Sequence, residues 1–156
     1  MMFRKEGGGE LYAYVPQNTE NANALANATP KTPDVPPNDE YGTSVGRRSF
    51  TWKTGAWTHV AQRVKLNTVG QANGEMEIFI DGKSTIRVTG LKLRTSNSNK
   101  VRGMVIQTFF GGEYSFSYVV VFAAFLMVSS LGHDSTWASP KKQRSYFKDF
   151  TAAIIY

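Results

Sequence analysis

Two tyrosines one residue apart, Tyr12 and Tyr14, are the side chains of this sequence whose type and spacing best suit chemistry. In an extended strand successive side chains point to opposite faces, so both phenols share one face while Leu11, Ala13 and Val15 share the other. Two adjacent phenols can serve as a proton-transfer pair or as a platform for a sugar ring. Strand chemistry alone favours simple packing, because tyrosine is common in strands.

Three further polar residues are candidates for binding an acidic ligand. Arg63 and Lys65 alternate with Val64 in a run that is typical of a strand, and they could line a cleft for an acidic polymer. A solvated strand face explains the same two charges equally well. Gln107 could donate a hydrogen bond to a substrate carboxylate, although a glutamine in a strand more often satisfies a backbone neighbour.

Composition limits the classes of function. The chain has 156 residues, enough for one domain with a real core, and its net charge of +6 favours a polyanionic partner. Nucleic acid is the weaker choice, because the basic runs are short. The chain has no cysteine and only two histidines, so we expect no disulfide, no metal site and no cofactor. We expect a monomer.

The elements that must position these residues read as strands. Strand-like runs separated by turn signals, with almost no helical periodicity, predict an all-β sandwich or jelly roll. Residues 19–38, rich in Asn, Ala, Thr and Pro, are predicted to be a loop without structure of its own. Asp81-Gly82 is a strong hairpin signal. Strands are predicted at residues 49–52, 57–66, 75–80, 84–88, 101–110 and 145–155.

One segment does not fit this pattern. Residues 114–132 carry no charge, and residues 118–128 are continuously apolar. The stretch is borderline in length for a membrane span, and a buried strand or helix is the ordinary alternative.

Several short motifs resemble a known family when they are taken in order. They are Gly-Glu-Leu-Tyr-Ala-Tyr-Val-Pro at residues 9–16, the run at 41–47, Gln62 to Asn67, Gln107 to Gly112 and the loop at 135–141. Together they resemble the fungal branch of the family 14 polysaccharide lyases, which are alginate and glucuronan lyases with a concanavalin-like jelly roll. The resemblance covers nearly the whole chain apart from one insert.

The resemblance implies a lyase that acts on a polyuronate. Such enzymes cleave by β-elimination: a base removes the proton α to the uronate carboxylate, an acid protonates the leaving oxygen, and a cation neutralises the carboxylate. The family's Tyr-x-Tyr pair maps onto Tyr12 and Tyr14 as catalytic residues, and Arg63, Lys65 and Gln107 are the expected substrate-binding residues. The alternative is a non-catalytic carbohydrate-binding jelly roll that uses the same face.

The sequence also departs from the family. Family members carry a cleft lysine in a Gly-Lys-Leu-Pro-Gly stretch and then a Ser-x-Arg, both upstream of the tyrosines, whereas Met1 falls just after the place of that arginine. The chain is therefore expected to be inactive or to retain trace activity. Family members are largely secreted, so an extracellular location is expected, although no signal peptide is visible.

Residues 113–132 form an atypical apolar insert in the single lyase-like domain, residues 1–156. We hypothesise that this segment is a translated intron. A membrane-associating hairpin is the second interpretation and a core strand is the third. No membrane partner is expected unless the apolar run is genuine.

Overall fold

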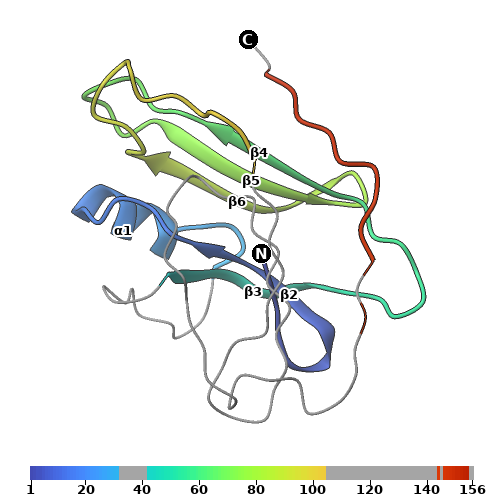
Figure 1. Ribbon diagram of the computed structural model, residues 1–156. Helices are drawn as coiled ribbons and strands as arrows, with labels where there is room; N and C mark the ends of the chain where they lie inside the picture. Colours follow the sequence, from blue (N-terminus) through green and yellow to red (C-terminus); the bar gives the residue numbers. More distant parts are fainter. Residues whose placement is uncertain (32–41, 105–143, 145, 155–156) are drawn as a thin grey trace, which may run out of the picture.

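The structure is a computed structural model that describes residues 1–31, 42–104, 144 and 146–154 (Figure 1). Within these residues the strands form two antiparallel sheets of three strands each. The N-terminal sheet has the order β1-β2-β3, with bounds Met2–Phe3, Gly8–Ala13 and Thr43–Thr51. The hairpin sheet has the order β4-β5-β6, with bounds Val60–Lys65, Gly74–Ile80 and Lys83–Leu91. A 3-10 turn at Lys5–Gly7 joins β1 to β2.

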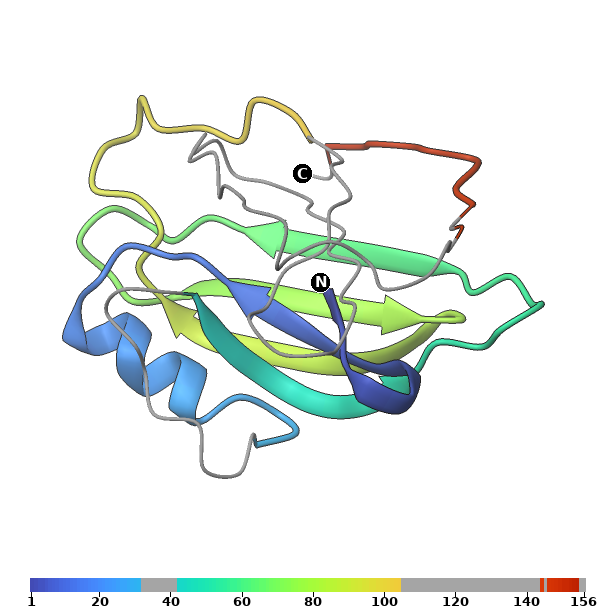
Figure 2. The same cartoon turned by 60° about the horizontal axis from the view of Figure 1, so that its bottom comes forward.

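The core lies between the two sheets. One cluster of buried side chains draws on both of them: Leu11, Ala13, Val45 and Phe50 from the N-terminal sheet, and Met76, Ile78, Ile86, Val88 and Leu91 from the hairpin sheet. The two sheets are seen as stacked layers in Figures 1 and 2. Because side chains alternate along a strand, each sheet has one face in this core and one face directed away from the other sheet.

A helix was not predicted where the structure has one. Residues 19–38 were expected to be a loop, but Thr19–Ala26 form α1 and only residues 27–31 of the rest are described. The prediction was therefore wrong for α1. Asn18 caps the helix, since its side chain accepts a hydrogen bond from the Asn21 backbone N–H at 2.8 Å.

Tertiary contacts then hold α1 in place. The buried Asn21 side chain donates to the backbone oxygens of Pro16 and Lys92 and accepts from the Lys92 backbone N–H. The composition of the segment concealed this helix, because its capping asparagine reads equally well as a loop residue.

The predicted strands agree with the structure in part. The Asp81-Gly82 hairpin between β5 and β6 is confirmed, and both turn residues have the positive φ of a type I′ turn, 50° and 79°. The predicted strand at 145–155 is wrong for residues 146–154. These residues form no strand and make no β-ladder with the described strands. Of the strand predicted at 101–110, residues 101–104 are irregular and the remainder lies outside the described residues, as does the insert at 113–132.

The prediction of an all-β fold is confirmed, because α1 is the one α-helix in the described part of the chain. No helix among those residues is long and apolar enough to cross a membrane. The apolar run at 118–128 is outside this search, so its predicted role is not tested.

Candidate active site on the outer face of the N-terminal sheet

Tyr12 and Tyr14 lie together, as the sequence predicts. Their rings are in an edge-to-face arrangement with centroids 5.4 Å apart. Tyr12 is half-buried and Tyr14 is half-exposed. Leu11 and Ala13, which alternate with them, are buried in the core, so the two phenols project from the outer face of the N-terminal sheet.

Gly42 gives the two rings their space. A Cβ added at this glycine would lie 2.7 Å from the Tyr12 ring and 3.0 Å from the Tyr14 ring. Any larger residue at this position would therefore displace the pair.

A buried ion pair lies beside Tyr12 on the same face. The Glu10 carboxylate is 0% exposed and accepts hydrogen bonds from the Arg4 guanidinium and, at 2.7 Å, from the Ser44 hydroxyl. Arg4 also donates to Ser44 Oγ at 3.1 Å, and its guanidinium carbon lies 5.8 Å from the centroid of the Tyr12 ring. Arg4 therefore places a cation next to the tyrosine pair.

An irregularity in β3 brings a second arginine to the same carboxylate. Leu11 pairs with Val45 and Gly9 pairs with Phe50, so residues 46–49 stand opposite Glu10 alone. Such a bulge bends the strand and redirects its side chains. Arg47 Nε lies 3.5 Å from Glu10 Oε2 as a result.

Gly46 makes this bulge possible. Its φ is 61°, in the left-handed region, and a Cβ there would lie 2.8 Å from the Ile86 side chain.

The electrostatics of the face keep Tyr12 protonated. Burial first, and then the neighbouring Tyr14, raise the pKa of Tyr12 to about 12; the Arg4 cation lowers it, and the Glu10 carboxylate opposes Arg4. At neutral pH Tyr12 is thus a neutral phenol that can donate a proton.

Arg63 and Lys65 lie elsewhere. Both project from the outer face of the hairpin sheet, since Val64 between them packs against the core. Arg63 donates to Glu77 at 2.7 Å and to Glu75 at 2.9 Å, and Lys65 donates to Glu75 at 3.1 Å. The structure does not bring these two residues to the tyrosine pair, which is on the outer face of the other sheet. Their role in substrate binding stays a prediction, as does that of Gln107, which lies outside the described residues.

The cross-strand ion pairs of the hairpin sheet make its stability depend on pH. The hydrogen bond from Ser84 and the contacts with Arg63 and Arg87 lower the pKa of the Glu77 carboxyl, although its desolvation opposes them. A carboxyl whose pKa is lowered on folding adds stability above its unfolded pKa, and this stability is lost as the pH falls through the folded pKa. Glu77→Gln should therefore flatten the acid limb of a plot of unfolding free energy against pH, measured by urea denaturation.

Ser84→Ala should flatten the same limb less, because it removes one of the donors to Glu77 and leaves Arg63 in place. Acid limbs of equal slope in Glu77→Gln and the parent chain would contradict this assignment.

Sequence reasoning missed Arg4, Glu10, Ser44 and Arg47. One signal for Glu10 was available in the sequence: it precedes Tyr12 by two positions, so its side chain is expected on the same strand face as the two phenols. Among the residues that the structure describes, no group of three or more His, Cys, Asp or Glu side chains could hold a metal ion.

Comparison with known proteins agrees with the all-β fold. The family model for polysaccharide lyase 14 matches residues 1–119. The chain belongs to the polysaccharide lyase 14 family. The predicted family is thus confirmed, whereas its fungal branch stays a prediction.

A solved relative supports the same fold. The chain is similar to the crystal structure of the marine PL-14 alginate lyase from Aplysia kurodai, with 25% sequence identity and a TM-score of 0.56. The match covers 89% of this chain and 45% of that chain, so this protein spans less than half the length of the solved lyase. The jelly-roll prediction is confirmed by this likeness. No curated protein matches the chain.

Proposed function

We propose that this protein is a lyase-type domain that acts on an acidic polyuronate, glucuronan or alginate, by β-elimination at the tyrosine pair. The observation that carries the proposal is the pair itself, with ring centroids 5.4 Å apart on an outer sheet face and the Arg4 cation alongside. Family membership supports the reaction class. An extracellular location is the corresponding expectation.

The proposed step uses both phenols. Tyr14, the more exposed of the two, takes the proton α to the uronate carboxylate as a phenolate, and a carbon–carbon double bond forms as the glycosidic carbon–oxygen bond breaks. Tyr12, which holds its proton, gives it to the leaving oxygen. A proton passed from Tyr14 to Tyr12 then restores the pair. Charge that builds up on the uronate during the step needs a nearby cation.

We further propose that turnover by this chain is low. Arg4, which lies beside Tyr12, and Arg47 both contact the buried Glu10 carboxylate, which offsets part of their charge. The cluster of Arg4, Arg47 and Glu10 therefore has a formal charge of only +1 to stabilise the developing negative charge.

A non-catalytic carbohydrate-binding role is the second candidate. The observation that favours it is the raised pKa of Tyr12, about 12, which makes the Tyr12 phenolate that proton donation leaves behind costly. An edge-to-face pair of rings can still pack against a sugar without any chemistry.

The test is the ultraviolet absorbance of unsaturated uronate ends. We expect the full chain to release them slowly from glucuronan or alginate and to release none from a neutral glucan. Polymer binding without unsaturated ends would favour the binding module, and neither binding nor product would contradict both candidates.

A further inference from the structure

We propose that Arg47 binds the carboxylate of a second uronate unit, next to the one held at the tyrosine pair, and that Glu10 holds its guanidinium in place. The inference rests on the proposed function. It adds a substrate-binding residue on β3 to the tyrosine pair.

The position of Arg47 follows from the strand register. Glu10 precedes Tyr12 by two positions on β2, so the two side chains are on the same face and roughly 7 Å apart along the strand. The bulge at residues 46–49 brings Arg47 to Glu10. Arg47 therefore flanks the tyrosine pair on the side of Glu10.

Burial distinguishes the two arginines of the cluster. The Arg4 side chain is 14% exposed, whereas that of Arg47 is 43% exposed. Arg4 is thus an internal cation that is held by Glu10 and Ser44 under Tyr12. Arg47 is the cation of this cluster that a polymer lying on the face can reach.

The Glu10 carboxylate does not fully neutralise the arginines that it contacts. One carboxylate is shared by two arginines, so Glu10 cannot neutralise both of them. A planar guanidinium with several N–H donors suits a carboxylate ligand better than an ammonium does. The contact with the fully buried Glu10 also restricts the Arg47 side chain, so binding costs less conformational entropy.

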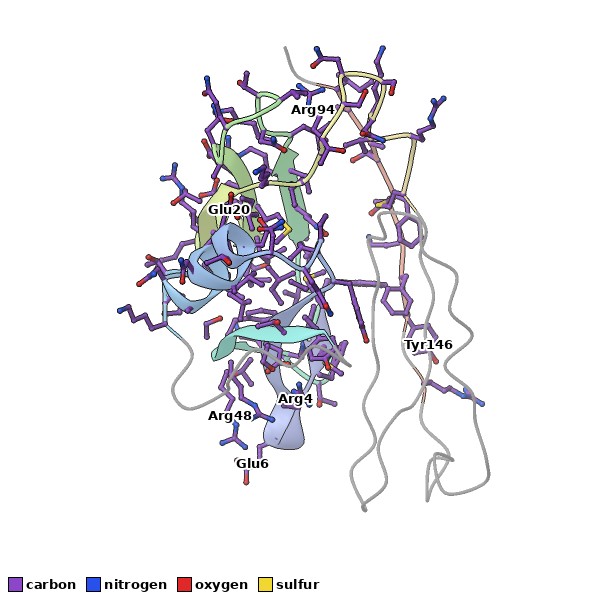
Figure 3. The ribbon with its side chains drawn as sticks, turned by 90° about the vertical axis from the view of Figure 1, so that its left-hand side faces the viewer. Arg4, Glu6, Glu20, Arg48, Arg94 and Tyr146 are labelled. Atoms are coloured by element: carbon purple, nitrogen blue, oxygen red, sulfur yellow. The ribbon has the colours of Figure 1, made fainter. Side chains whose placement is uncertain are left out.

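The next residue in the chain offers a matched control. Arg48 has the same charge and is 54% exposed, but it pairs with Glu6 at 3.7 Å, away from Glu10. Figure 3 shows Arg48 and Glu6 close together at the tip of the N-terminal sheet. Loss of either arginine changes the net charge of the protein by the same amount.

The experiment measures binding of a short oligoglucuronate to the full chain by calorimetry. We expect Arg47→Gln to weaken binding about fivefold, near the upper end for an exposed charge pair, and Arg48→Gln to change it much less. The difference in binding affinity between the two variants should become smaller in high salt, because salt screens the charge of Arg47. Equal losses in the two variants, or no binding to the parent chain, would overturn the proposal.

Two further arms keep the result decisive. Arg47→Lys keeps a charge beside Glu10, so it should fold, and its binding should fall between the parent and Arg47→Gln because the two-donor fork is lost. Parental affinity in Arg47→Lys together with a misfolded Arg47→Gln would count against the proposal. A methyl-esterified oligomer, which is neutral, should bind the parent and Arg47→Gln with equal affinity. If Arg47→Gln bound this neutral ligand fivefold more weakly than the parent, the carboxylate would not be the group that Arg47 recognises.

The formation of unsaturated ends is followed separately. Binding that depends on Arg47 without any cleavage would contradict the lyase and leave this subsite standing.

Discussion

Tyr12→Phe should lower kcat for polyuronate cleavage by about 10²- to 10⁴-fold, the range for loss of a positioned general acid. The change removes the phenol oxygen and keeps the ring that packs against Tyr14 and Gly42. KM should therefore change little. The measurement is the initial rate of unsaturated-end formation across substrate concentrations.

Tyr146→Phe is the matched control for this change. Tyr146 is an exposed tyrosine of the C-terminal segment, and Figure 3 shows it apart from Arg4 and the N-terminal sheet. It should retain the parental kcat. If Tyr12→Phe also retained the parental kcat, Tyr12 would not be the proton donor.

Alkaline stability gives a second readout that needs no turnover. Burial raises the pKa of Tyr12 to about 12, from about 10 in an unfolded chain. A group whose pKa is raised on folding contributes stability that is fully present below the unfolded pKa and is lost as the pH rises through the folded pKa. The parent should therefore lose stability between about pH 10 and 12, and Tyr12→Phe should lose less over the same window.

Side-chain alternation made the tyrosine face predictable. Tyr12 and Tyr14 share a face because strand geometry requires it, and the burial of Leu11 and Ala13 decides that this face points away from the core. The Asp81-Gly82 turn was equally predictable, because both its residues tolerate positive φ. Local rules were sufficient in these places.

The rest of the site depends on contacts between distant parts of the sequence. The alternation of Arg63 and Lys65 with Val64 was correct, but it could not tell which of two sheets would carry them. The bulge that brings Arg47 to Glu10 depends on pairing between β2 and β3, which are separated by α1 and by residues outside the described part of the chain. No periodicity within a single strand contains that information.

Glu10→Ala should lower the free energy of unfolding by about 3–5 kcal/mol, the usual effect of removing one partner from a buried ion pair. Glu10 is 0% exposed and is bound by Arg4 and Ser44. Its loss would take from Arg4, whose side chain is 14% exposed, the carboxylate that accepts from its largely buried guanidinium. Urea denaturation followed by circular dichroism measures the change.

Glu6→Ala is the matched control, since this glutamate is 70% exposed and pairs with Arg48 at 3.7 Å. It should cost less than about 1 kcal/mol, as exposed ion pairs do. Equal effects of the two substitutions would show that burial of the Glu10 carboxylate has no energetic consequence.

A double-mutant cycle separates the charge of Glu10 from its packing. Arg4→Met combined with Glu10→Ala should be less destabilised than the sum of the two single changes, because neither buried charge is then left alone. Glu10→Gln should lie between Glu10→Ala and the parent, since its side-chain oxygen can still accept from Arg4 and Ser44 without the charge. Additive single changes would mean that Arg4 and Glu10 do not stabilise each other, and that the cation beside Tyr12 does not depend on Glu10 for its position.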